Sequence, residues 1–222
     1  MSFEKRRRAS VTCAVLLLSH ATAEWLELRP DGAALVGSSP VLGSAPEDVA
    51  KAAVAAMRAA GGTERRIVLA LSGQLALQRT LVLPDLARKE LARVFPRKAA
   101  ALLECAQQDV LYAALPIQRE RQGAEAAAEQ KWQLVALRRP FMLALRKALR
   151  RERIQVARVV SAPLARLCEA QRLRDDSEKA CIVVDVERDG VAVSLIAGDA
   201  LRMQNRIIGS FESVPTMALS GR

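Results

Sequence analysis

The chain has 222 residues, enough for one large domain or two small ones with a buried core. Apolar residues make up 51% of it, which excludes global disorder, and aromatic residues only 3%, which disfavours a stacking platform for single-stranded nucleic acid. The net charge of +10 indicates that an acidic or anionic partner must be considered.

The content of cysteine and histidine argues against several kinds of site. The four cysteines form no C-x-x-C pair, and His20 is the single histidine, which we interpret as a surface or turn residue. This composition disfavours a zinc site and a Ser-His-Asp triad, and we interpret the cysteines as reduced thiols of a cytosolic protein. The apolar runs of the sequence are shorter than the roughly 20 residues that span a bilayer.

The start of the chain allows two interpretations. A basic beginning, a short apolar stretch and the small residues 21–23 are compatible with a secretory signal peptide. Alternatively, residues 11–18 form a β-strand that leads into a hairpin over AEWLELRPDG (23–32). We favour the strand because Thr12 and Ser19 interrupt the apolar stretch, and because cleavage would leave an odd number of cysteines.

A helix is predicted after a further short strand over residues 32–42. Ser44 is its expected N-cap, Pro46 suits the first turn, and Gly61 ends the helix. A second helical region starts after Pro84, and Pro96 is expected to break it, since proline lacks the N–H that an interior helix position needs.

The remaining elements follow from apolar alternation and turn residues. Strands are expected at 67–71, 75–83, 109–117, 131–139 and 156–161, helices at 140–153 and 162–173, and three more strands within 179–210. The order is ββ(β)α, then ββαββα, then βα, then βββ. It predicts a mixed α/β or α+β chain with the middle block inserted as a small layered unit.

Three stretches of the chain occur in an order that is typical of a known family. They are LALSGQLALQRTLVLPDLARKEL (69–91), AALLECAQQDVLYAALPI (100–117), and FMLALRKALRRERIQVARVVSAPLARL (141–167) followed by ACIVVDVERDGVAVSLIAGDALRMQNRIIG (180–209). In this order they resemble the actin-like ATPase fold of the PilM/GspL group. The members of that group are cytoplasmic platform proteins of type IV pilus assembly and type II secretion.

The resemblance covers nearly the whole chain and implies its domain organisation. Residues 1–64 and 154–222 would form the first subdomain of an actin-like, ribonuclease-H-like fold, and residues 65–153 the inserted ββαββα-type subdomain. The second actin-like half would be missing, because the chain stops about where that half begins. We therefore expect a truncated fragment of a longer protein or a naturally short relative.

The resemblance also implies where ATP and magnesium would bind, on two phosphate hairpins that each read apolar-Asp-apolar-Gly. When this pattern is placed on the first hairpin, Leu17 occupies the position of the acid and Ser19 the position of the glycine. In the second hairpin Asp185 keeps the acid, but Glu187 takes the glycine position, where its charge repels phosphate. Together with Gly190, Ser19 and Asp185 are the candidate residues of a degenerate cofactor site, and we expect no catalytic residue and no bound metal.

Asp185 has a second interpretation, which we favour. A carboxylate near the end of an apolar strand can be satisfied by turn amides or by a nearby arginine, with residues 189–190 forming the hairpin turn. The acid would then be inherited and structural.

The basic residues of the chain are unevenly distributed. Between residues 138 and 159 there are eight Arg or Lys residues and a single acid, Glu152. On the predicted helix from Pro140 to Arg153, the apolar residues share one arc and the basic residues lie mostly elsewhere. The basic patch of this helix is either a solvated face or a surface for the anionic inner leaflet or an acidic partner, and it consists of Arg146, Lys147, Arg150 and Arg151.

Two functions from different classes remain open. The resemblance implies a non-catalytic scaffold in the cytoplasm, peripheral to the inner membrane. It would bind the cytoplasmic segment of a membrane-anchored pilus or secretion protein near residues 75–83 and 111–117, and could contact the motor ATPase. The alternative is an ATP-binding, actin-like ATPase completed by the missing half. A third hypothesis, nucleic-acid binding, is supported only by the positive net charge of the chain.

Overall fold

The computed structural model of the chain describes residues 13–119, 129–172, 180–187, 190–197 and 200–208. These residues form two compact units. The first lies within residues 1–77, 96–112 and 135–162, and the second within residues 78–95, 113–134 and 163–222.

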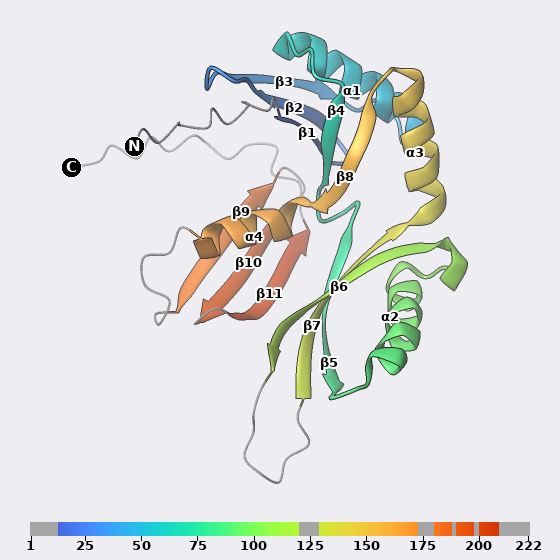
Figure 1. Cartoon of the computed structure of the whole chain (residues 1–222), viewed down its shortest axis with the longest axis vertical. Helices are drawn as coiled ribbons and strands as arrows, with labels where there is room; N and C mark the ends of the chain where they lie inside the picture. The colour runs from blue at the N-terminus through green and yellow to red at the C-terminus, as the bar shows by residue number, and fades with distance from the viewer. Residues whose placement is uncertain (1–12, 120–128, 173–179, 188–189, 198–199, 209–222) are drawn as a thin grey trace, which may run out of the picture. The chain divides into compact units, whose positions relative to one another are not determined.

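The first unit is built on a five-stranded sheet with the strand order β3-β2-β1-β4-β8 (Figure 1). Its first three strands form an antiparallel meander, and β4 and β8 run parallel to β1. The strands are β1 (Cys13–Leu18), β2 (Thr22–Leu28), β3 (Ala34–Pro40), β4 (Arg66–Leu71) and β8 (Gln155–Ser161). The predicted hairpin is confirmed for the described residues, and alternate residues of β1 face the core, as half-buried strands require.

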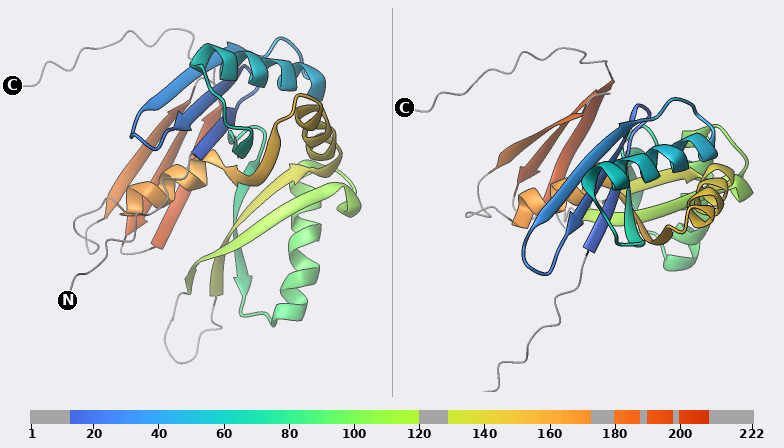
Figure 2. Two further views of the ribbon diagram at one scale, coloured as in Figure 1. Left: turned by 45° about the horizontal axis from the view of Figure 1, so that its top comes forward. Right: turned by 90° about the horizontal axis from the view of Figure 1, so that it is seen from above.

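Two helices pack side by side against one face of this sheet. Helix α1 (Pro46–Ala60) contacts β2, β3 and α3, and α3 (Arg139–Arg151) also contacts β8. Figure 2 shows α1 lying across the antiparallel strands. Gly37 permits this approach, because a Cβ atom there would overlap the backbone of Ala56 and Ala60 in α1.

The ends of α1 test the predicted start and stop signals. Gly61 is the C-cap in the left-handed conformation, with φ of 66°, and Pro46 is the first helical residue, both as predicted. The prediction of Ser44 as the N-cap is wrong. The N-cap is Ala45, which makes no side-chain hydrogen bond, and Ser44 stands one residue too early in the chain.

A separate three-stranded sheet has the order β5-β7-β6 and carries helix α2. Its elements are β5 (Leu77–Pro84), α2 (Arg88–Leu103), the short 3₁₀ helix η1 (Gln107–Asp109), β6 (Val110–Arg119) and β7 (Glu129–Arg138). Phe95 of α2 packs edge-on against Trp132 of β7, with 4.9 Å between the ring centres. The predicted break at Pro96 is wrong. Buried neighbours on both sides of this residue, Phe95 and Ala99, keep α2 continuous despite the missing N–H.

The chain continues into a third, antiparallel sheet of order β11-β10-β9 in the second unit. Helix α4 (Ala162–Arg172) precedes the strands β9 (Cys181–Glu187), β10 (Gly190–Ala197) and β11 (Ala200–Ile208). Leu164 of α4 and Val183 of β9 pack against the buried Ile196. The three strands predicted within residues 179–210 are therefore confirmed.

The predicted fold class, a mixed α/β chain with an additional small sheet, is confirmed. Within residues 65–153, which were expected to form the insertion, strand β4 belongs to the five-stranded sheet and helix α3 contacts β8 of that sheet. The assignment of residues 1–64, 65–153 and 154–222 to subdomains stays a prediction. Within the described part of the chain, every helix is too short or too polar to cross a bilayer.

Candidate functional site

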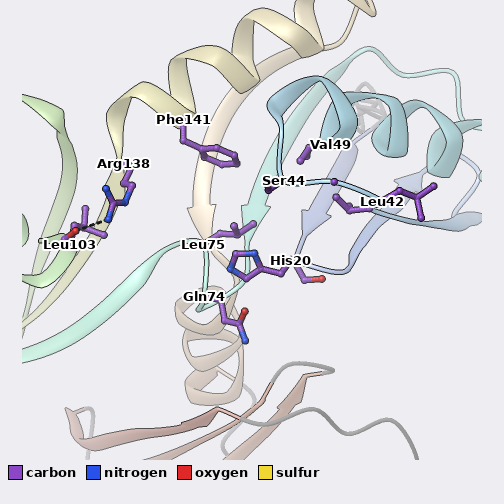
Figure 3. A pocket seen from close by; sticks show the side chains of 12 residues that line it. His20, Leu42, Ser44, Val49, Gln74, Leu75, Leu103, Arg138 and Phe141 are labelled. Carbon is purple, nitrogen blue, oxygen red and sulfur yellow. Dashed lines mark hydrogen bonds between the residues drawn. The ribbon is translucent and has the colours of Figure 1, made fainter. Parts of the chain in front are cut away.

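A pocket of about 490 Å³ opens in the first unit (Figure 3). It lies beyond the carboxyl ends of the parallel strands β1 and β4, which meet at the same edge of the sheet. This edge is where open α/β sheets usually bind ligands, because the loops after the strands leave a crevice there. The lining residues are Ser19, His20, Val41, Leu42, Gly43, Ser44, Val49, Gln74, Leu75, Leu103, Arg138 and Phe141.

Most of the pocket wall is apolar. Leu75 follows β4, Phe141 stands in the first turn of α3, and Leu42 lies in the loop between β3 and α1. Leu42 is 91% exposed, so a large aliphatic side chain faces solvent at the pocket. Such a wall favours an occupant with apolar side chains.

The polar groups of the pocket are cationic or neutral. Arg138 donates a hydrogen bond from Nη2 to the backbone oxygen of Leu103 at 2.9 Å, which fixes its guanidinium group beside the pocket. His20 follows β1, and Gln74 follows β4. The lining residues include no Asp and no Glu, whereas the Asp48 carboxylate lies beside the lining residue Gly43. Arg138 is the lining group that can pair with a carboxylate of an occupant.

The turn between β1 and β2 holds Ser19, a predicted cofactor residue. Ser19 Oγ accepts the N–H groups of Ala21 at 3.2 Å and Thr22 at 2.9 Å, and the Ser19 N–H donates to the Thr22 oxygen. A phosphate cradle uses such backbone N–H groups as donors. In this turn the N–H groups of Ala21 and Thr22 already donate to Ser19 Oγ. The role of Ser19 in cofactor binding stays a prediction.

The other two predicted cofactor residues lie on the hairpin of β9 and β10 in the second unit. Asp185 is paired with Ala192 across the strands, and Gly190 with Glu187 next to the turn. The proposed turn at 189–190 begins outside the described residues. Asp185 and Gly190 thus share one hairpin, whereas Ser19 belongs to the first unit, and their roles stay predictions.

A buried acid that the sequence reasoning missed lies in β2. Glu27 is 1% exposed, and its Oε2 accepts the N–H groups of Thr63 at 2.8 Å and Glu64 at 3.0 Å. Burial by itself raises the pKa of Glu27. The backbone N–H groups of Glu64 and Thr63, assisted by the Trp25 indole and the Thr63 hydroxyl, outweigh this effect, and the pKa lies below its ordinary value.

Glu27 is structural, because it ties the loop after α1 to β2. The alternation of β2 was a usable signal, since Ala23, Trp25 and Glu27 share the inward face. Within the described part of the chain, no group of three His, Cys, Asp or Glu side chains is placed to hold a metal ion.

All members of the predicted basic patch are exposed on α3. Arg151 approaches Glu47 of α1 to 3.9 Å, and both of these side chains are more than half exposed. The contribution of such a surface pair to stability is small. The role of Arg146, Lys147, Arg150 and Arg151 at a membrane or partner stays a prediction.

The predicted binding groove near residues 75–83 and 111–117 stays a prediction, and these residues are divided between the two units. Leu75 lines the pocket, and Val82 of β5 and Leu115 of β6 are each 51% exposed. Sequence reasoning did not identify Arg138 and Phe141 as pocket residues, because Arg138 ends β7 and Phe141 lies in α3, both far along the chain from the other lining segments.

Comparison with solved structures reveals the fold. The chain superposes on a protein of the "PilM-PilN type IV pilus biogenesis complex" with a TM-score of 0.70 at 18% identity, over 90% of this chain. It superposes on the cytoplasmic domain of EpsL, an inner membrane component of the type II secretion system of Vibrio cholerae, with a TM-score of 0.57 at 14% identity, over 89%. A Bacteroides thetaiotaomicron protein of unknown function with an actin-like ATPase fold gives 0.56 at 9% identity, over 94%.

These likenesses confirm the predicted actin-like fold and its similarity to the PilM/GspL group. The chain spans 62% of the length of the pilus protein, 71% of the EpsL domain and 74% of the Bacteroides protein. No family model matches the sequence, and no curated protein matches it.

Proposed function

We propose that this chain is a scaffold of a type IV pilus or type II secretion platform. It would act in the cytoplasm at the inner membrane and bind the cytoplasmic segment of a membrane-anchored partner. The fold is that of proteins from both systems, one of them a component of a PilM-PilN complex. A contact with the motor ATPase is a further part of the proposal.

The observation that carries the proposal is the pocket of the first unit. Its volume of about 490 Å³ suits a few side chains of an extended segment rather than a large folded partner. Apolar side chains of the segment would fill the space between Leu42, Leu75 and Phe141. A carboxylate of the segment would pair with Arg138, which is already oriented by its bond to Leu103.

The alternative is an ATP-binding chain completed by a second actin-like half. Two N–H groups of the first hairpin are used by Ser19 Oγ, and Leu17 stands where the family has a carboxylate. Both features weigh against a phosphate site on this hairpin. The scaffold is therefore the function that the geometry supports better.

The experiment is a calorimetric titration of the full chain with a synthetic peptide. The peptide is the N-terminal cytoplasmic segment of the membrane protein encoded next to this chain. We expect saturable binding that Leu42→Asp weakens at least about ten-fold, because the introduced charge replaces an apolar contact. Arg138→Gln should weaken the binding of a peptide that contains an acidic residue. It should weaken less the binding of the same peptide in which that residue is replaced by its amide.

The matched control is Val36→Asp. Val36 is 69% exposed on β3 and does not line the pocket, so the same change of charge should leave peptide binding intact. Equal loss in both variants, or no binding by the native chain, argues against the pocket as the binding site. Magnesium-dependent binding of a fluorescent ATP analogue that Asp185→Asn abolishes would favour the ATPase alternative.

A further inference from the structure

Helix α3 has two sharply different faces. The inward face consists of the buried residues Met142, Leu145, Ala148 and Leu149. The outward face is exposed, and since residues of a helix are 100° apart, its members fall within an arc of about 100°. They are Arg139, Leu143, Arg146, Lys147 and Arg150. We call this set the α3 outer face.

Within the described part of the chain, the charge of the α3 outer face is not compensated by ion pairs. The helix itself contains no acid from Arg139 to Arg151. Arg151, at the side of this face, approaches Glu47. Among the residues that the structure describes, Arg146, Lys147 and Arg150 lie within ion-pair distance of no carboxylate. With respect to the described residues, these three cations are therefore available to an external anion.

Leu143 adds an apolar group to the centre of this face. Its side chain is 57% exposed between the cations, with Arg139 one turn before it and Lys147 one turn after it. Alternating aliphatic and long cationic side chains are typical of helices that lie at a lipid–water interface, where the alkyl stems and the leucine enter the headgroup layer.

Helix α2 is also basic, but unlike α3 it carries an acid. Its exposed cations are Arg88, Lys89, Arg93, Arg97 and Lys98. Glu90 stands between two of them, Lys89 and Arg93. This acid lies one turn from Arg93 and lowers the local positive potential. Its presence makes the first two turns of α2 a suitable internal control, since the cations there have an acid beside them on the helix and those of α3 have none.

We propose that the α3 outer face binds the anionic headgroups of a phospholipid bilayer. A fluid anionic surface is favoured over a folded acidic protein by the charge complementarity, by the spread of the cations along the helix and by the exposed leucine. The inference deepens the proposed function and depends on it for the location at the inner membrane. It assigns the membrane contact to a surface separate from the pocket residues.

The test is co-sedimentation of the full chain with vesicles of phosphatidylcholine alone and with a third of phosphatidylglycerol. We expect binding only to the anionic vesicles, weakening as salt is raised. Each cation near such a surface contributes about five-fold to the partition coefficient. The partition coefficient should therefore fall on the order of 100-fold in the triple variant Arg146→Gln, Lys147→Gln and Arg150→Gln. It should fall several-fold in Leu143→Ser.

The control removes the same number of charges from α2, as Arg88→Gln, Lys89→Gln and Arg93→Gln combined. All six substituted residues are exposed, so both variants should fold, which circular dichroism checks. We expect the control to retain most of the binding. Equal loss in the two triple variants would show that only net charge acts, and would overturn the assignment to α3.

Two further outcomes contradict the proposal. One is the absence of binding to anionic vesicles. The other is binding of duplex DNA that the α3 variant loses while vesicle binding stays unchanged, which would identify the face as a nucleic-acid surface. Leu42→Asp keeps the test independent of the peptide, because this variant should lose peptide binding and keep vesicle binding.

Discussion

The two ends of the five-stranded sheet differ in how their polar and apolar groups are satisfied. At the amino end of β4, Glu27 accepts the N–H groups of Thr63 and Glu64 and is almost completely buried. At the carboxyl ends of β1 and β4, Leu42 and Arg138 are exposed around a pocket. The first arrangement stabilises the fold, and we call this end of the sheet the closed end. The second leaves groups available for a partner, and we call it the open end.

The largest expected effect is at the closed end. Glu27→Ala removes the acceptor of two N–H groups and leaves them without a protein partner, which should lower the free energy of unfolding by about 3 kcal/mol. Chemical denaturation followed by circular dichroism measures the change. A loss below about 1 kcal/mol would mean that water replaces the carboxylate and that this end is not closed.

Gly37→Ala is expected to rank second. The new Cβ would overlap the backbone of Ala56 and Ala60, so β3 and α1 must move apart at a cost of about 2 kcal/mol. The melting temperature reports the loss. Gly32→Ala controls for glycine replacement in general: its added Cβ meets no atom, and only the positive φ of 85° adds strain.

The pH dependence of stability should follow from Glu27. Its pKa is lowered in the folded chain, so the stabilisation is complete above the ordinary value of 4.5 and is lost as the pH falls through the folded pKa. Denaturation curves between neutral pH and acid should thus show a loss that Glu27→Gln reduces. Parallel pH profiles of the two proteins would contradict the role of this carboxylate.

A smaller effect is expected in the turn at the open end. Ser19→Ala removes the acceptor for the N–H groups of Ala21 and Thr22 and should cost about 1 kcal/mol, because solvent can reach this turn. Thermal denaturation measures it. If the loss equals that of Glu27→Ala, the two ends of the sheet do not differ as described.

The smallest effect on stability is expected for Leu42→Asp. With 91% of its surface exposed, Leu42 contributes little to the core, and the change in unfolding free energy should stay within about 0.5 kcal/mol. Denaturation of the variant checks this. A larger loss would assign Leu42 to the fold instead of the pocket.

The order of strands and helices followed from local signals. The alternation of residues 13–18, the proline at the start of α1 and Gly61 at its end each act through the backbone of a few neighbouring residues. The break expected at Pro96 is absent, because contacts with residues far along the chain keep this segment helical. Packing of Phe95 against Trp132 supports α2 across the proline.

The pocket was only partly predictable. Leu75 was expected near a groove, but His20, Arg138 and Phe141 come from segments that the strand order brings together. Glu27 was also only partly predictable. The alternation of β2 indicates that its side chain points inward, but its hydrogen-bond partners lie 36 and 37 residues away in the sequence. Such contacts depend on loop paths between strands, which short-range patterns do not specify.

The sequence by itself therefore determined the succession of elements, the resemblance to an actin-like fold and the cationic character of α3, because periodicity and charge are properties of neighbouring residues. Only the tertiary structure decided which end of the sheet is closed and which carries the pocket. It did so by pairing β1 with β4, which sets Ser72 N–H against the Leu18 oxygen at 2.8 Å and brings the segments after both strands to one edge.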